Sequence, residues 1–288
     1  MIRRLATVSA AAFTGLLCMA GMVGAAGAAG AATGASASIP QPGGRIIRAH
    51  EPGASALPTI SLNWSGYAAV SAKKFNYVHS TFLQPKISCT GAPNRWTSNW
   101  VGLDGFTDAT VEQDGTFAFC GGANHMVAQY VAWYEMYPAG SVAVFRVKPG
   151  DQMDASVRYS SGKFTLTIAD LTSGKTATKQ AACSSCERSS AEWIIERPAL
   201  CNSSFTKCFL TALADFHTTV MRSDVAQLAG GKVKGVGGFV NYPIFMVNPL
   251  KTGGFISLDT VSALSGPAFA ATWDRSGTTV PITLGPER

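Results

Sequence analysis

Short segments in which polar and apolar residues alternate recur along this chain, with glycine-containing turns between several of them. The pattern is found in SVAVFRV at 141–147, DASVRY at 154–159, KFTLTIADL at 163–171 and FISLDTVSAL at 255–264. A period of two places successive side chains on opposite faces, which is typical of a half-buried β-strand. No alternation of strands with helices and no internal repeat is visible. The chain is therefore predicted to be all-β, as an antiparallel sandwich or barrel.

The first 32 residues have the order of a secretory signal peptide. Arg3 and Arg4 precede an apolar run, which is followed by an alanine-rich zone. Residues 33–60 are rich in Gly, Ser, Ala and Pro and are interpreted as a linker or short pro-segment. Residues 61–288 are expected to form a single β domain. We therefore expect a secreted, extracellular protein that is not attached to a membrane once the signal has been removed.

The charge pattern argues against a nucleic-acid partner. The chain carries a net charge of +6, and the excess of Lys and Arg is scattered instead of forming a basic run. No glycine-rich loop that follows a strand and opens a helix is present, so nucleotide binding has no support either. We expect a monomer.

Six of the seven cysteines lie beyond the signal peptide, as expected for a disulfide-bonded exported chain. Cys201 and Cys208 bracket a turn-like loop and are expected to pair. Cys183 and Cys186 are expected to form a tight structural bridge, although a redox CxxC remains an alternative. Cys89 and Cys120 are then left to pair by elimination. A zinc site competes with this interpretation, but no His lies at ligand spacing, so no metal and no cofactor are expected.

Two carboxylates share one face of the predicted strand AEWIIERP at 191–198. Alternation groups Glu192, Ile194 and Glu196, whereas Ala191, Trp193 and Ile195 face the other way. A similar strand, YVAWYEMYP at 130–138, places Trp133 and Glu135 on one face among aromatic residues. Trp100, Asp104 and Gln113 lie in the turn-rich segment 97–115. Neither a G-x-S-x-G elbow nor an HExxH motif is present, so carboxylates and amides remain as candidate catalytic groups.

Six short motifs in a fixed order resemble the eqolisins, a family of glutamic peptidases. They are NWSGY at 63–67, WVGLDG at 100–105, EQDG at 112–115, AWYEMYP at 132–138, AEWIIERP at 191–198 and the Cys-x6-Cys that follows it. The resemblance implies two large antiparallel sheets in a lectin-like jelly roll. It also implies that this is a secreted, bacterial-type endopeptidase that hydrolyses polypeptides.

By the same resemblance, Glu196 is the general base that activates water, and Gln113 stabilises the tetrahedral oxyanion. Trp100, Asp104 and Glu135 fall on the supporting groups, with Asp104 and Glu135 expected to orient the Gln113 amide. Trp133 and Glu192 are expected to line the substrate groove. A carboxylate can exchange a proton with water, and a side-chain amide can donate to an oxyanion.

The chain departs from the family pattern at three points. Val131 replaces an acidic residue, and a family cysteine after the WVGLDG segment is absent, so that Cys186 is left to pair with Cys183. The sequence pI of about 9.0 contrasts with the acidic fungal members.

Two other functions compete with the peptidase. A glycoside hydrolase could use Glu135 and Glu196 as its carboxylate pair, with Trp100, Trp133 and Trp193 as sugar platforms. A non-catalytic module for carbohydrate or peptide binding would also fit the aromatic residues. Gln113 separates the first alternative from the peptidase, because a glycosidase does not need it.

Overall fold

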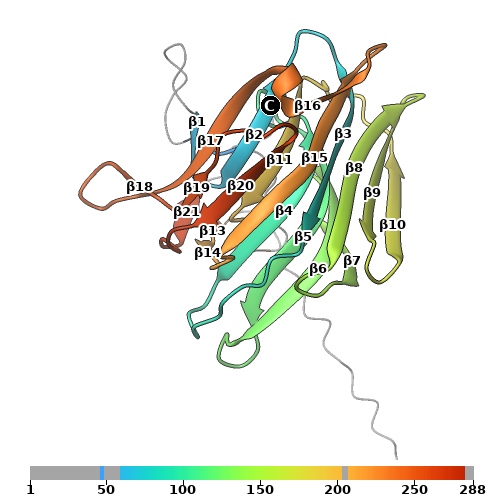
Figure 1. Cartoon of the computed structure of the whole chain (residues 1–288). Helices are drawn as coiled ribbons and strands as arrows, with labels where there is room; N and C mark the ends of the chain where they lie inside the picture. Colours follow the sequence, from blue (N-terminus) through green and yellow to red (C-terminus); the bar gives the residue numbers. More distant parts are fainter. Residues whose placement is uncertain (1–45, 49–58, 203–206, 283–288) are drawn as a thin grey trace, which may run out of the picture. The chain divides into compact units, whose positions relative to one another are not determined.

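The computed structural model describes residues 46–48, 59–202 and 207–282 (Figure 1). The expected signal peptide, residues 1–32, lies outside the described residues. Helical structure in the described ranges is limited to the short 3-10 helix η1 (Val236–Gly238). None of it is long and apolar enough to cross a bilayer. The expected all-β fold is therefore confirmed.

The larger sheet has ten strands, and its main path runs β1, β17, β2, β11, β4, β5, β6, β7. β14 pairs with β4 and β18 pairs with β17 at its margins. Most pairs are antiparallel, whereas β1–β17 and β14–β4 are parallel. The strands are β1 (Thr59–Ser61), β2 (Trp64–Val70), β4 (Arg95–Leu103), β5 (Val111–Gly121), β6 (Val127–Tyr137), β7 (Val142–Arg146), β11 (Ser190–Glu196), β14 (Ala212–Leu213), β17 (Val240–Pro249) and β18 (Phe255–Ser257).

The second sheet has eight antiparallel strands, in the order β10, β9, β8, β3, β15, β20, β19, with β16 paired to β15. Three of the alternating sequence segments fall on strands of these two sheets with similar bounds. The strands are β3 (Phe75–Leu83), β8 (Gln152–Ser160), β9 (Lys163–Asp170), β10 (Lys175–Ala181), β15 (Thr218–Leu228), β16 (Val233–Gly235), β19 (Asp259–Val261) and β20 (Ala268–Trp273).

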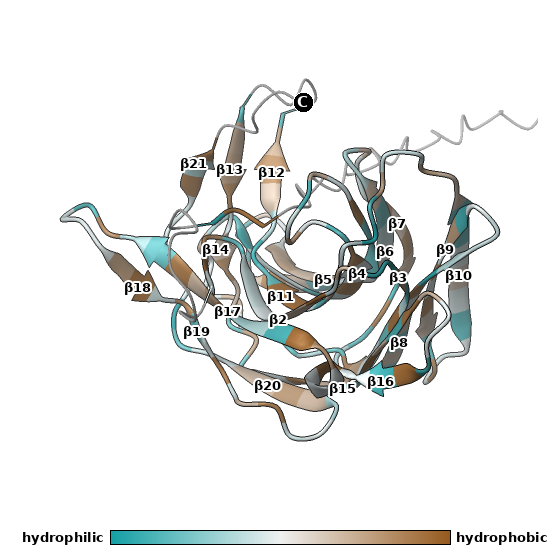
Figure 2. Ribbon diagram, turned by 90° about the horizontal axis from the view of Figure 1, so that it is seen from above, coloured by the Kyte–Doolittle hydropathy of each residue, from teal (hydrophilic) through white to brown (hydrophobic). Residues whose placement is uncertain are grey.

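A small third sheet joins β12 (Ala199–Cys201), β13 (Cys208–Leu210) and β21 (Val280–Ile282). Figure 2 shows the two large sheets as separate layers, with this small sheet on the side of the larger sheet that faces away from the second. The chain enters it directly from the end of β11, so the small sheet lies close to the last residues of that strand.

Alternation gives the larger sheet two apolar faces. Trp193 of β11 lies opposite Tyr67 of β2 and Val101 of β4, and these residues join the core shared with the second sheet. Ile194, one residue later, belongs to a separate apolar cluster that includes Trp64 and Trp100. The central strands are therefore buried on both sides, and every residue of β11 is buried, including Glu192 and Glu196.

The three disulfides pair the cysteines as expected from the sequence: Cys89–Cys120, Cys183–Cys186 and Cys201–Cys208. The last joins β12 to β13 within the small sheet. The first closes the longest loop, with a sequence separation of 31 residues.

The domain begins before the expected boundary at residue 61. β1 starts at Thr59, and Arg48 forms an isolated antiparallel bridge with Ser61. Part of the expected linker is thus paired with the first strands of the sheet.

Candidate active site

Sheet register brings four expected site residues onto one face of the larger sheet. Glu196 lies opposite Ser98 of β4, and Trp100 follows two residues later on the same strand face. Gln113 of β5 lies opposite Gly102 of β4 and opposite Glu135 of β6. Because side chains alternate along each strand, these groups all point away from the core between the two sheets.

The Glu196 carboxylate receives one side-chain hydrogen bond on each oxygen. Trp100 Nε1 donates to Oε2 at 2.9 Å, and Asn63 Nδ2 donates to Oε1 at 3.3 Å. Only 1% of Glu196 is exposed. Burial raises its pKa to about 8, and the hydrogen bonds from Trp100 and Asn63 act in the opposite direction. Two donors on two oxygens suit the ionised form, which is the form that a general base requires.

The Gln113 amide is held by its cross-strand neighbour. Gln113 Nε2 donates to Glu135 Oε2 at 2.5 Å, and both side chains are almost completely buried. Burial raises the pKa of Glu135 well above its ordinary value, the charge of Glu196 adds to this, and the Gln113 hydrogen bond opposes it. An amide nitrogen carries two hydrogens, so Gln113 keeps one hydrogen for a further acceptor.

Aromatic side chains surround these polar groups. Trp64 and Trp100 pack edge to face with ring centroids 4.8 Å apart, and Phe117 stacks on Trp133 at 4.5 Å. Their rings belong to the apolar cluster on this face of the sheet. These rings exclude water from the carboxylates, and the loss of hydration raises the pKa values of Glu135 and Glu196.

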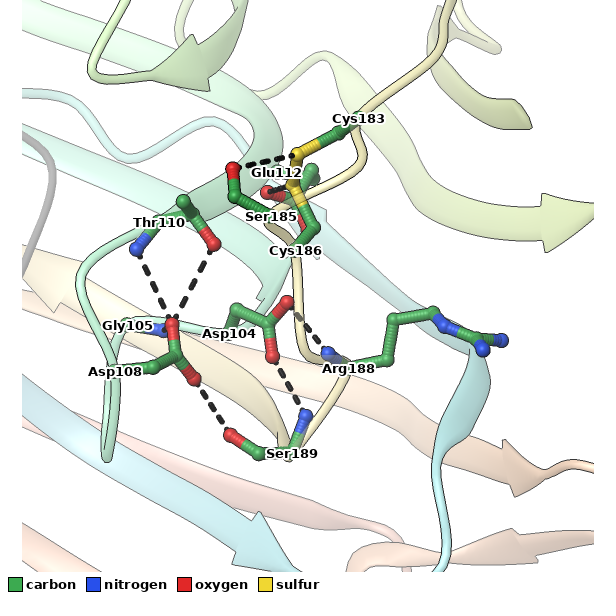
Figure 3. Close-up of a disulfide and its surroundings, with 10 residues drawn as sticks. All are labelled: Asp104, Gly105, Asp108, Thr110, Glu112, Cys183, Ser185, Cys186, Arg188 and Ser189. Carbon is green, nitrogen blue, oxygen red and sulfur yellow. Dashed lines mark hydrogen bonds between the residues drawn. A yellow bond between two sulfur atoms is a disulfide. The ribbon is translucent and has the colours of Figure 1, made fainter. Parts of the chain in front are cut away.

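The sequence predicted that Asp104 orients the Gln113 amide, but in the structure Asp104 supports a neighbouring loop instead. Its two carboxylate oxygens accept the backbone N–H groups of Arg188 at 2.7 Å and Ser189 at 2.6 Å (Figure 3). β4 ends at Leu103, and Asp104 has a φ of 72°, so the alternation of the strand does not extend to it. Burial and the charge of Asp108 raise its pKa to about 6.

Glu192 shares its strand face with Glu196 but has a different electrostatic environment. Burial raises the pKa of Glu192 well above its ordinary value, and the charges of Asp104, Asp108 and Glu112 contribute. Glu112 itself is turned to the opposite face of β5 from Gln113, where Cys186 Sγ lies 2.8 Å from its Oε1. The structure thus places an acidic cluster, formed by Asp104, Asp108, Glu112 and Glu192, apart from Gln113 and Glu196.

Trp193, which the glycosidase alternative placed beside the carboxylates, lies on the core face. Its Nε1 donates to the backbone oxygen of His79 at 2.9 Å. It therefore cannot act as a sugar platform next to Glu196.

A set of potential metal ligands lies beside the acidic cluster. The ligand atoms of Glu112, Cys183 and Cys186 all lie within 4.8 Å of one another. The two sulfurs are bonded to each other, however, and a disulfide offers no thiolate to a metal.

A serine, a histidine and an aspartate also meet at the surface. Ser88 Oγ lies 3.1 Å from His217 Nε2, and His217 Nδ1 lies 3.3 Å from Asp215 Oδ1. The His217 side chain is 58% exposed, and Asp215 Oδ1 also accepts the backbone N–H of His217. A catalytic triad needs a buried aspartate and a shielded imidazole, so we interpret this contact as a surface turn.

Asn63 is the site residue that sequence reasoning missed. It belongs to the NWSGY motif, but nothing in the motif indicates which side chain its amide will meet. Its contact with Glu196 spans 133 residues and depends on the pairing of β2 with β11.

Comparisons with known proteins relate the chain to one family and to several solved structures. A sequence model described as the peptidase A4 family matches residues 62–248. Scytalidopepsin B from Scytalidium lignicola is 30% identical over 181 residues, which cover 60% of this chain and 66% of that protein, slightly under two thirds.

Solved structures share the fold. The crystal structure of scytalido-glutamic peptidase with a transition state analog inhibitor matches with a TM-score of 0.63 and 24% identity, over 74% of this chain and 98% of that one. A member of the eqolisin family of peptidases in a complex with the tripeptide Ala-Ile-His matches with a TM-score of 0.60 and 22% identity, over the same shares.

Proposed function

The chain belongs to the peptidase A4 family, and from this premise we propose that it is a glutamic endopeptidase in which Glu196 and Gln113 carry the reaction. The observation that supports this most directly is the pair of donors on the Glu196 carboxylate, on the same sheet face as the Gln113 amide. The substrates are polypeptides, and the protein acts outside the cell after removal of its leader.

In the proposed reaction, Glu196 takes a proton from a water molecule as the water oxygen attacks the carbonyl carbon of the scissile peptide bond. Trp100 and Asn63 hold the carboxylate in place and favour its charged form. The same carboxyl group can then return the proton to the leaving amine. One residue thereby serves as base and then as acid, and no metal or cofactor takes part.

Gln113 stabilises the negative charge that develops on the carbonyl oxygen. Glu135 accepts one hydrogen of the amide nitrogen, and this fixes the orientation in which the second hydrogen is available to the oxyanion. Loss of one such donor typically costs about 2.7–4 kcal/mol of transition-state stabilisation. Glu135 is thus a positioning residue in this scheme.

Digestion of a denatured protein at several pH values tests the proposal. The wild type is expected to release peptides, and Glu196→Gln is expected to release them only at background level. Asp224→Asn is the matched control, because Asp224 is another buried carboxyl with a pKa raised to about 8 by burial but belongs to the second sheet. Full activity in the Glu196 variant would contradict the proposal.

A further inference from the structure

Three residues that precede β1 lie against the catalytic face of the larger sheet. We call Ile46, Ile47 and Arg48 the docked segment. Ile47 O accepts the backbone N–H of Leu62 at 2.7 Å, and Arg48 forms a bridge with Ser61. Ile46 packs against the apolar cluster that contains Trp100. The docked segment is therefore joined to the sheet by backbone pairing and by an apolar contact.

Arg48 adds a second anchor. Its Nη2 donates to the backbone oxygen of Phe106 at 2.9 Å, and its guanidinium lies 4.6 Å from the centre of the Phe106 ring. Phe106 belongs to the same apolar cluster as Trp64 and Trp100. The anchors of the docked segment thus reach both the end of β1, at Ser61 and Leu62, and the loop after β4, at Phe106.

The docked segment also determines which end of the Asn63 amide faces the catalytic carboxylate. Asn63 Oδ1 accepts the backbone N–H of Ile47 at 2.7 Å and the hydroxyl of Ser61 at 3.0 Å. Because two donors occupy the oxygen end, the nitrogen end is turned toward Glu196 Oε1. A reversed amide would aim its oxygen at a carboxylate oxygen and repel it.

We propose that the docked segment is a working part of the catalytic domain, and that it positions Asn63 so that Glu196 is held as the ionised base. This inference rests on the proposed function, because it assigns a role to Glu196 in catalysis. It assigns residues 46–48 to the active enzyme instead of to a discarded linker, so removal of the N-terminal region must stop before Ile46.

The charged groups near Glu196 do not stabilise its ionised form, so hydrogen-bond donors must do so. Glu135 of β6 is the carboxylate whose charge couples to Glu196, and it opposes a second negative charge. Arg197 follows Glu196 but donates to Leu62 O and Asn248 Oδ1. Arg95 of β4 donates to Ser276.

Within the described residues, the ionisable side chains of β2 and of the docked segment also donate no hydrogen bond to the Glu196 carboxylate. Tyr67, the ionisable residue of β2, points to the core face, and its hydroxyl donates to Ser262 O. Arg48 of the docked segment is directed to Phe106 O, as described above. Among these groups no cation donates to the Glu196 carboxylate, so the N–H donors Asn63 and Trp100 oppose the effect of burial.

Proline and alanine at position 47 give a matched pair of variants. Ile47→Pro removes the N–H that Asn63 accepts but keeps the carbonyl that pairs with Leu62. Ile47→Ala trims the side chain and keeps the N–H. Asn63→Ala removes the amide itself and supports the test if the proline variant fails to fold.

The readout is the pH dependence of kcat/KM on a quenched fluorogenic peptide. Ile47→Pro and Asn63→Ala are expected to move the acidic limb to higher pH by about 1–2 units, the equivalent of one hydrogen bond to a charged group. Because Ile47→Ala keeps the N–H that Asn63 accepts, its acidic limb is expected to stay at the wild-type pH, whatever the change in overall rate. The double variant is expected to shift no further than Asn63→Ala alone, because both changes act through one amide.

Two results would overturn the inference. One is a wild-type acidic limb in Asn63→Ala or in a folded Ile47→Pro, and the other is a uniform rise in kcat at all pH values in Ile47→Pro, which would mean that the segment obstructs the site. Either result leaves the proposed function standing. A wild type without peptidase activity, or an active Glu196→Gln, refutes the proposed function itself.

Discussion

The indole N–H of Trp100 donates to the carboxylate of Glu196 at 2.9 Å, across two neighbouring strands of one sheet. The two residues are not directly opposite each other, since Glu196 pairs with Ser98 and Trp100 pairs with Ile194. The indole therefore reaches diagonally to a neighbour about one strand period away. This contact ties the proposed catalytic carboxylate to β4 and to the aromatic cluster.

Replacement of Trp100 by Phe tests this contact. Trp100→Phe keeps an apolar ring in the cluster but removes the donor, so Glu196 becomes harder to ionise. We expect the acidic limb of the pH profile to move to higher pH. At pH values below the limb, kcat/KM should fall about 10–100-fold, in line with one lost hydrogen bond to a charged group. Trp193→Phe is the control, because its indole also donates a hydrogen bond but on the core face. An unchanged pH profile in Trp100→Phe would argue against the role of the indole.

Gln113 should affect turnover more than substrate affinity. Gln113→Ala is expected to lower kcat by about 10²–10³ with a smaller change in KM, as for loss of one oxyanion donor. In Gln113→Glu, the new carboxyl group donates only when protonated, so residual activity is expected to be confined to acid. Alanine at the exposed Gln180 of β10 serves as the control. A Gln113→Ala enzyme with wild-type kcat would exclude the oxyanion role.

The sequence predicted the all-β fold, and for several strands it also predicted which residues share a face, because alternation is a local property. The segment at 163–171 forms β9 (Lys163–Asp170), and the 191–198 segment contains most of β11 (Ser190–Glu196). The grouping of Glu192 with Glu196 on one face follows from the same periodicity. The proposal that Gln113 and Glu196 act together came from the resemblance to a family. Periodicity alone cannot show that residues on two separate strands share a site.

Two features could not be predicted, and each has a physical cause. Asp104 follows the end of β4 with a positive φ, so its direction depends on a turn and not on the strand period. The orientation of the Asn63 amide depends on a hydrogen bond from the backbone N–H of Ile47, and a backbone group leaves no trace in the sequence. Pairings between distant segments and turn conformations are decided by the whole fold.

Glu135 should act through the orientation of Gln113. Glu135→Gln replaces an acceptor by a group whose nitrogen end would face the Gln113 amide nitrogen, unless one of the two amides rotates. We expect a fall in kcat smaller than that of Gln113→Ala, and no further fall when Glu135→Gln is combined with Gln113→Ala. Steady-state kinetics of the two single variants and the double variant measure this. Additive losses would show that Glu135 acts independently of Gln113.

The disulfides should contribute to stability according to the loops that they close. In the chain-entropy treatment, a bridge across 31 residues stabilises by about 3.7 kcal/mol and one across 7 residues by about 2.5 kcal/mol. Paired Cys→Ser variants of Cys89–Cys120 and Cys201–Cys208 are expected to lose free energy of unfolding in that order. Urea denaturation of both variants measures the difference, and a larger loss for the shorter loop would contradict the entropic account.

Buried carboxyl groups should make this protein most stable in acid. Burial raises the pKa of Asp259 to about 7, of Glu196 and Asp224 to about 8, and of Glu112 to about 10, from ordinary values of 3.8 for Asp and 4.5 for Glu. Each of these groups binds its proton more tightly in the folded state than in the unfolded state. The stability that they contribute is therefore fully present below about pH 4 and is lost as pH rises through the folded values.

The expected result is a melting temperature that falls from about pH 4 to about pH 8, since each pKa unit corresponds to about 1.4 kcal/mol. Asp224→Asn should flatten this dependence because an amide does not ionise, while its oxygen can still accept the hydroxyl of Ser80. Glu187→Gln, at an exposed carboxyl, should leave the dependence unchanged. Thermal unfolding followed by circular dichroism at pH 4, 6 and 8 measures this dependence. A melting temperature that is highest at pH 8 would mean that these carboxyl groups are ionised in the folded protein. If Glu196 is the base, as proposed, catalysis and stability have opposite requirements at this residue, because burial favours the protonated form and the reaction needs the ionised form.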